Sequence, residues 1–125
     1  MKIRINGNQL RLRLTVDEWQ RFKLKGKVED AIQFDPVQKI IYTLRISQGV
    51  DQVQACYNHP FIMVLVPQAV AQCWIDGDEV GISASMELEG DKQLHIVVEK
   101  DFKCLSERAE DQNLNLFPHP ERLNT

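Results

Sequence analysis

The sequence predicts an α+β protein, with a curved antiparallel sheet of about seven or eight strands and two short helices packed on its outside. Two observations predict it. Apolar and polar residues alternate through most of the chain, as expected for strands that bury one face. Two short segments instead repeat apolar residues with helical spacing, and each begins at a helix-start signal. The sheet either stays open or closes into a barrel.

The first predicted element is a hairpin with one apolar and one cationic face. Residues 2–5 and 9–14 alternate isoleucine or leucine with lysine, arginine or glutamine. The link over residues 6–8 reads Asn-Gly-Asn, and these residue types tolerate the positive φ of a tight turn. We therefore expect two strands that pair with each other.

A helix is predicted directly after this hairpin. Thr15 stands three residues before Glu18, which is the spacing of a capping box, so the helix should begin at about residue 16. Trp19 and Phe22 fall on one helical face, and Gly26 is placed to end the helix. That apolar face should pack on the leucines of the preceding strand.

The middle of the chain predicts more strands. Residues 27–34 and 39–46 alternate apolar and polar side chains, and Asp35 and Pro36 form a turn between them. Residues 53–57 can add a short strand.

The second half continues with a strand, a helix and a hairpin. Residues 61–66 are apolar at every position, which is typical of a strand in the middle of a sheet. Pro67 suits the first helical position, and apolar residues recur with helical spacing up to Trp74. Residues 80–88 and 94–100 then alternate and predict the last two strands.

The two halves of the chain share one pattern of elements. Each half reads strand, helix, strand, strand, with one more short strand available to it. A shift of 52 residues places Leu10, Leu12 and Leu14 on Ile62, Val64 and Val66, Phe22 on Trp74, and Val28 on Val80. We therefore expect a single domain over residues 1–103, built from a repeat of about 1–52 and 53–103, and an irregular tail over 104–125.

Composition narrows the class of protein. The 125 residues, 43% of them hydrophobic and 26% charged, suit one folded domain. A formal net charge of -3 gives no general attraction to nucleic acid or to an anionic membrane, and neither is an expected partner. Without an apolar run of signal-peptide or membrane-spanning type, we expect a cytoplasmic protein. The three cysteines are widely spaced, which favours reduced thiols.

Several segments together resemble a known but uncharacterised family. These segments are Lys2 to Asn8, Leu10 to Thr15, Glu99 to Leu105, Glu110-Asp111 and Phe117-Pro118. They resemble an uncharacterised family of small bacterial proteins, best represented among Bacteroidetes, over nearly the whole chain. The resemblance implies no activity.

The predicted architecture is also similar to the CYTH-like triphosphate-tunnel fold. That fold is an antiparallel barrel whose polar lumen binds triphosphates together with a metal ion. Its Glu-x-Glu-x-Lys signature does not occur here, and the first strand carries Lys2 and Arg4 instead. The resemblance implies a barrel-like sheet and phosphate binding, without the metal-dependent hydrolysis.

The cationic strand faces are the main candidate site. Arginine forks hold phosphate or carboxylate groups with two hydrogen bonds, and arginines on adjacent strands of a concave sheet would converge. The candidate ligand-binding residues are Arg4, Arg11, Arg13, Lys39 and Arg45. In the repeat, Arg11 and Arg13 correspond to Met63 and Leu65, which predicts a cleft with one cationic and one apolar side. The alternative is a solvated face that forms cross-strand ion pairs with Glu29, Glu87 or Glu99.

Catalytic motifs are sparse. His95 and Glu99 lie four residues apart on one predicted strand and could act as a base and its orienting group, although a lone strand histidine is usually structural. The tail carries Cys104, Glu107, Glu110, Asp111 and His119. These residues lack the close paired spacing of a structural zinc site, so we predict no metal site, and the sequence does not identify a cofactor. The chain also lacks a Gly-rich phosphate loop and a Gly-x-Ser-x-Gly nucleophile turn.

The sequence therefore favours binding over catalysis. The first hypothesis is a small cytosolic protein that binds an anionic small molecule, such as a phosphate compound, in the manner of a degenerate CYTH-like phosphohydrolase. The second is a non-enzymatic protein-interaction domain that uses a sheet edge or the C-terminal tail.

Overall fold

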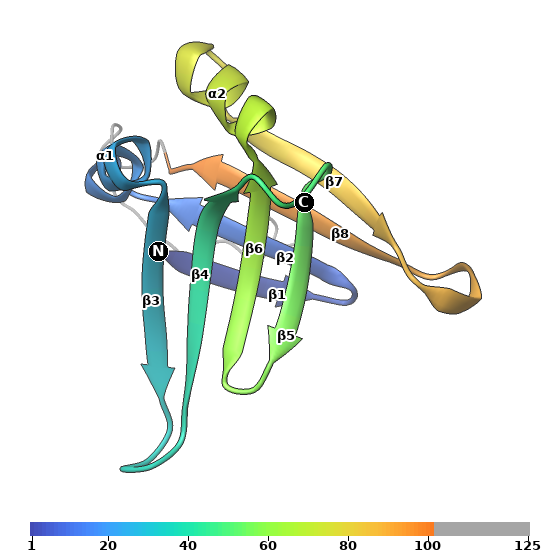
Figure 1. The fold of residues 1–125 in the computed structure, drawn as a ribbon. Coiled ribbons are helices and arrows are strands. Elements are labelled where there is room, and N and C mark those ends of the chain that lie inside the picture. The colour runs from blue at the N-terminus through green and yellow to red at the C-terminus, as the bar shows by residue number, and fades with distance from the viewer. Residues whose placement is uncertain (102–125) are drawn as a thin grey trace, which may run out of the picture.

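The structure, a computed structural model, describes residues 1–101. These residues form an α+β fold with eight strands and two α-helices, as predicted (Figure 1). The strands are β1 (Lys2–Asn6), β2 (Gln9–Leu14), β3 (Lys27–Gln33), β4 (Lys39–Ser47), β5 (Gln54–Asn58), β6 (Phe61–Pro67), β7 (Gly81–Glu87) and β8 (Gln93–Lys100). The helices are α1 (Val16–Lys25) and α2 (Gln68–Asp76), and a short 3-10 turn, η1 (Glu89–Asp91), joins β7 to β8.

The strands divide into two four-stranded sheets that do not close into a barrel. One sheet has the order β1-β2-β8-β7 and the other β3-β4-β6-β5. The hairpin pairs are antiparallel, as predicted, but the two central pairs, β2 with β8 and β4 with β6, are parallel. The closed antiparallel barrel that the tunnel resemblance implied is therefore not formed. Alternation shows which face of a strand is buried but not which distant strand lies beside it.

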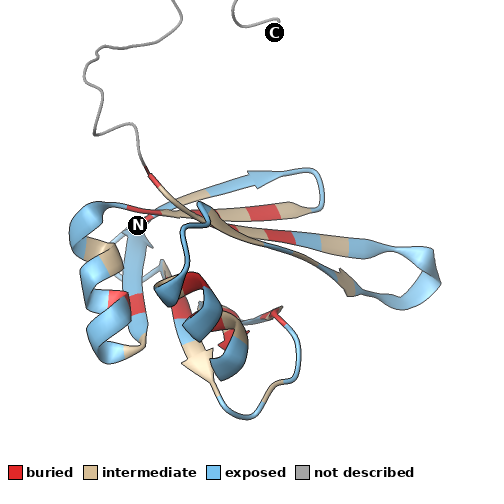
Figure 2. Cartoon of the chain, turned by 90° about the horizontal axis from the view of Figure 1, so that it is seen from above, coloured by how far each residue is buried: buried red, intermediate tan, exposed pale blue. Residues whose placement is uncertain are grey.

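The core lies between the two sheets. Buried and less buried positions alternate along the strands (Figure 2). In β2 the leucines are buried while the residues between them are partly exposed, so Arg11 and Arg13 point away from the core as predicted. The inner face of this sheet also carries Ile96 and Val98. It packs against the buried side chains of the second sheet, which include Val28, Tyr42, Leu44, Val64 and Val66. The leucines of β2 and the valines of β6 thus face each other from two different sheets, instead of lying in the single sheet that the sequence predicted.

Both helices lie at the same end of the two sheets, at the top of Figure 1. Helix α1 has the predicted capping box: Thr15 Oγ1 accepts from the Glu18 amide at 3.3 Å, and Glu18 Oε1 accepts from the Thr15 amide at 2.9 Å. It ends at Gly26, whose φ of 74° suits glycine. In helix α2, Pro67 is the N-cap residue and not the first helical residue, so the helix begins one residue later than predicted.

An aromatic cluster joins the helices to the core. Phe22, which was expected to pack on the preceding strand, is completely buried, and so is Trp74, while Trp19 is half-buried. The ring centroids of Trp19 and Trp74 lie 4.5 Å apart, and those of Phe22 and Trp74 lie 5.8 Å apart. This cluster closes the helix end of the space between the sheets.

The same order of elements occurs in both halves of the described chain. Pairs in β1–β2 match pairs in β5–β6 at an offset of 52 residues, since Lys2 opposes Arg13 and Gln54 opposes Leu65. Pairs in β3–β4 match those in β7–β8 at an offset of 54, so Val28 corresponds to Ile82 and not to Val80. Extra residues between α2 and β7 explain the change of offset. The duplication itself stays a prediction, and the predicted tail over 104–125 lies outside the described residues.

No helix in the described part of the chain is long and apolar enough to cross a membrane.

Candidate functional site

The predicted cationic residues fall into two separate groups. Arg4, Arg11 and Arg13 lie on the outer face of the sheet β1-β2-β8-β7. Lys39 and Arg45 lie on the outer face of the other sheet, with Arg45 between Lys27 and Leu65. The two outer faces point away from each other because the sheets pack through their inner faces. The five residues therefore do not converge on one site.

The predicted cleft with an arginine side and an apolar side is also not formed. Met63 and Leu65 lie on the outer face of β6, beside Thr43 and Arg45, in the sheet that does not contain β2. Equivalent places in the two halves thus occupy opposite outer surfaces of the molecule.

Carboxylates neutralise one end of the cationic face. We define the cationic face as the outward side chains of β1 and β2, namely Lys2, Arg4, Arg11 and Arg13. Glu99 Oε2 accepts from Arg11 Nη1 at 3.2 Å and from Arg13 Nε at 2.8 Å. Lys2 Nζ lies 3.3 Å from Asp101 Oδ2. The predicted cross-strand pairing with Glu99 is therefore present, and it leaves the other end of the face less neutralised.

A small recess lies at that other end. Arg4, Asn6, Gln9 and Arg11 line it, and its volume is about 100 Å³. Since a water molecule takes up about 30 Å³ of liquid, this space suits a group the size of phosphate or carboxylate. Arg4 and Arg11 are directly opposite in the ladder of β1 and β2, and within residues 1–101 Arg4 has no ion-pair partner. We call this space the anion recess.

His95 and Glu99 do not contact each other, and each has other partners. Both face outward from β8, but four residues along a strand span roughly 13 Å. His95 is exposed, and its Nδ1 lies 2.9 Å from Ser85 Oγ, while Glu99 is bound to the two arginines. Within residues 1–101, no three His, Cys, Asp or Glu side chains lie together as a metal site. Cys104, Glu107, Glu110, Asp111 and His119 lie outside this range.

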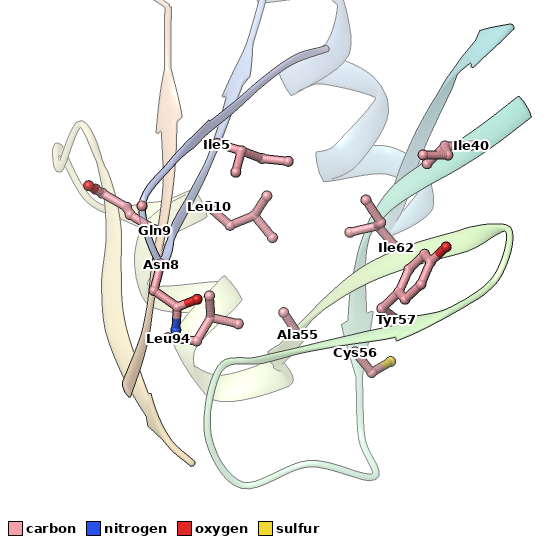
Figure 3. A pocket seen from close by; sticks show the side chains of 11 residues that line it. Ile5, Asn8, Gln9, Leu10, Ile40, Ala55, Cys56, Tyr57, Ile62 and Leu94 are labelled. Carbon is pink, nitrogen blue, oxygen red and sulfur yellow. The ribbon is translucent and has the colours of Figure 1, made fainter. Parts of the chain in front are cut away.

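A larger recess, which the sequence did not suggest, opens between the two sheets. Ile5, Leu10 and Leu94 line it from one sheet, and Ile40, Ala55 and Ile62 line it from the other (Figure 3). Asn8, Gln9 and Tyr57 add polar atoms, and the volume is about 390 Å³. We call it the inter-sheet groove. It lies beside the turns of the β1–β2 and β5–β6 hairpins, at the end of these strands that is away from the helices.

The shared pattern of the two halves contains a signal for this groove. Ile5 and Leu10 flank one hairpin turn, and Tyr57 and Ile62 flank the other, at the same offset of 52 residues. Because β2 and β6 each lead directly into a helix, both helices cover the far ends of these strands. Within residues 1–101, no helix covers the apolar residues beside the two turns.

A cluster of charges joins the chain start to α1 and β3. The Met1 ammonium group forms hydrogen-bonded ion pairs with Glu18 and with Asp30. Burial disfavours the charged form of Glu18, but hydrogen bonds from Met1 and Thr15 outweigh it and lower its pKa. The hydrogen bond from Met1 lowers the pKa of Asp30, and the two carboxylates raise the pKa of the Met1 amine despite its burial. This cluster holds structural elements together and lines neither recess.

Comparison with known proteins identifies a family but no function. No curated protein and no solved structure matches the chain. Residues 1–121 match the model of a family described as a family of unknown function (DUF7009). The match covers nearly the whole sequence, in agreement with the resemblance to an uncharacterised family that the sequence segments indicated. The chain therefore belongs to the family of unknown function DUF7009.

Proposed function

We propose that this protein is a non-enzymatic binding protein for a small anion, namely the phosphate or carboxylate group of a small molecule, which it holds in the anion recess. The observation that carries the proposal is the pairing of Arg4 with Arg11. The two residues oppose each other on β1 and β2, and Arg4 has no ion-pair partner within the described residues.

Electrostatics favours an anion at this position over the rest of the cationic face. Like charges directly opposite on neighbouring strands destabilise a sheet, and a bound anion between them removes that cost. Arg13 and Lys2 already have Glu99 and Asp101 as partners, whereas Arg11 shares Glu99 with Arg13. The least neutralised pair is thus Arg4 with Arg11, and the recess lies against it.

The chemistry of the lining also suits an oxyanion. Two guanidinium groups can each donate two parallel hydrogen bonds to phosphate or carboxylate oxygens. The side-chain amides of Asn6 and Gln9 can donate further hydrogen bonds at the edges. The part of the chain that the structure describes contributes no carboxylate, histidine or thiol to the lining that could act as a base or nucleophile, so the proposal includes no hydrolytic step.

The expected affinity is modest because the recess is shallow and open to water. A hydrogen bond to a charged group contributes about 1.5 to 3 kcal/mol to the free energy of binding. One such bond from each of the two arginines corresponds to a Kd in roughly the millimolar range. Contacts with the rest of a natural ligand would tighten binding. Of the five predicted ligand-binding residues, Arg4 and Arg11 belong to this site, while Arg13 holds Glu99 beside it.

Titration with inorganic phosphate, acetate and pyrophosphate tests the proposal. Arg4→Gln and Arg11→Gln should each weaken binding of the preferred anion at least tenfold, about 1.4 kcal/mol. The matched control is Arg45→Gln, because Arg45 is an exposed strand arginine on the other sheet. The Arg45→Gln variant should bind the preferred anion with the same affinity as the unaltered protein. An equal loss in all three variants would show a non-specific charge effect and would reject the recess as the site.

The second candidate is the protein-interaction domain, and one observation favours it. At the β3–β4 hairpin, Ile32, Phe34 and Val37 are 47%, 63% and 83% exposed, next to the edge strand β3. Exposed apolar side chains beside an unpaired edge are typical of a contact surface. In sedimentation velocity, this candidate predicts concentration-dependent association that Phe34→Ser abolishes. A monomer at all concentrations would exclude association of two copies through this hairpin.

A further inference from the structure

We infer that the inter-sheet groove is a second binding site, which takes a neutral and largely apolar small organic molecule. This inference goes beyond the proposed function, because the groove and the anion recess lie on opposite faces of the β1–β2 hairpin. Of the described residues, only Gln9 borders both spaces.

The first argument is the contrast between the two ends of the space between the sheets. At the helix end, the side chains fill the space completely, and Leu12, Leu14 and Val66 are at most 1% exposed. At the other end the two inner faces have no helix between them, and Ile5 and Tyr57 are 67% and 61% exposed. Figure 3 shows the apolar side chains of the two sheets facing each other across the groove. The groove is therefore a part of the core region that the described chain does not fill.

The second argument is the shape and size of the space. Sites for small molecules are concave, lined mainly by apolar side chains, and typically about 300 to 1,000 Å³ in volume. The groove has about 390 Å³ and walls of isoleucine, leucine and alanine from both sheets. Because these walls are strands of two packed sheets, the site is formed before any ligand arrives.

The third argument concerns charge, and it sets the class of ligand. Among residues 1–101, no charged side chain lines the groove. A carboxylate or ammonium group in such surroundings would be desolvated without a partner, which is strongly unfavourable. The polar side chains of the lining are the amides of Asn8 and Gln9, the phenol of Tyr57 and the thiol of Cys56, which can all form hydrogen bonds without carrying a charge. The groove thus selects a neutral molecule with an apolar body and a few hydrogen-bonding atoms.

Tyr57 gives the site an aromatic wall with a fixed orientation. Its hydroxyl lies 2.9 Å from His59 Nδ1, in the turn that connects β5 to β6. A tyrosine side chain held by its hydroxyl presents its ring to the groove at little further entropic cost, which suits a ligand that contains a flat ring.

The position of Asp101 favours a separate molecule over the protein's own C-terminal segment as the occupant of the groove. The Asp101 amide donates to the Leu14 carbonyl at 2.8 Å, so the chain leaves from the helix end of β2. The groove lies at Gln9 and Leu10, near the other end of that strand. The apolar residues Leu116 and Phe117 are the strongest competing occupants in the remaining sequence, and the experiment below distinguishes them.

The experiment measures binding of the neutral fluorescent probe N-phenylnaphthylamine to the full chain. We expect saturable binding to one site, with at least tenfold weaker binding in Ile5→Asp, because this change places a charge in the groove. Leu24→Asp is the matched control, since Leu24 is an apolar residue on α1 that is 81% exposed and does not line the groove. Thermal unfolding of both variants verifies that they are folded, and Tyr57→Ala provides a second groove variant.

Further measurements separate the groove from the anion recess and a small molecule from the C-terminal segment as the occupant of the groove. Arg4→Gln and added phosphate should leave probe binding unchanged, so failure of the anion recess and failure of the groove can be told apart. Absence of saturable binding, or equal losses in Ile5→Asp and Leu24→Asp, would overturn the inference. Stronger probe binding after the double change Leu116→Asp and Phe117→Asp would also overturn it, because the C-terminal segment would then be the natural occupant.

Discussion

Truncation of Phe22 to alanine tests the aromatic cluster that closes the helix end of the fold. Phe22 is completely buried, and its ring centroid lies 5.8 Å from that of Trp74 and 6.1 Å from that of Trp19. Removal of a buried phenylalanine ring costs about 3 to 5 kcal/mol through lost transfer energy and the cavity left behind. Loss of the two ring contacts places the expected value in the upper half of that range.

The magnitude is large compared with the total stability of a small domain, which is about 5 to 15 kcal/mol. Urea denaturation, followed by tryptophan fluorescence, should therefore show a much lower midpoint with an unchanged slope. Leu24→Ala on the same helix is the control, because Leu24 is exposed and should change the free energy of unfolding by less than about 0.5 kcal/mol. A loss below about 1 kcal/mol for Phe22→Ala would refute the packing of α1 against α2.

Three further predictions concern the framework of the fold. Thr15→Ala removes the cap of α1 and should lower the free energy of unfolding by about 1 kcal/mol in the same assay, whereas Thr15→Ser should retain most of it. Gly81→Ala should destabilise by about 1 to 3 kcal/mol, because an added Cβ would lie 2.2 Å from the Val98 carbonyl oxygen; a neutral result would show that β7 is placed wrongly against β8. The Met1 ammonium group lowers the pKa values of Glu18 and Asp30, so both ionised carboxylates stabilise the folded protein. Their contribution to the free energy of unfolding is complete above their ordinary pKa values of 4.5 and 3.8, and it is lost as the pH falls through the lowered values. Urea midpoints measured from pH 7 down to about pH 2 should fall steeply in that acidic range, and Glu18→Gln should flatten the fall.

Sequence reasoning predicted the elements whose causes are local. The capping box of Thr15 with Glu18, the stop at Gly26 and the Asn-Gly-Asn turn each depend on neighbours in sequence, and the structure confirms the helix and the hairpin they predicted. The uniformly apolar segment 61–66 was expected in the middle of a sheet, and β6 indeed lies between β4 and β5.

The assembly of those elements could not be predicted in the same way. Parallel pairing of β2 with β8 joins residues 9–14 to 95–100, and no local pattern encodes such a distant neighbour. Because that pairing places β2 and β6 in different sheets, the arginines of β2 and the apolar residues Met63 and Leu65 end on opposite surfaces.

The candidate site shows the same division. The outward direction of Arg4 and Arg11 follows from strand alternation, but the position of Glu99 beside Arg11 and Arg13 follows only from the neighbouring strand β8. The inter-sheet groove was missed because Ile5 and Tyr57 look like ordinary inward residues of a strand. Their exposure depends on where the two helices lie in three dimensions.

The most direct test of the anion recess follows the arginine side chains themselves. NMR spectra of the guanidinium Nε–H groups, recorded during titration with inorganic phosphate, report on each arginine separately. Arg4 and Arg11 should shift with one common saturation curve, while Arg13, whose Nε already donates to Glu99, and the distant Arg45 should stay in place. Equal small shifts of all four resonances, or no saturation at Arg4 and Arg11, would contradict the proposal that this recess binds an anion.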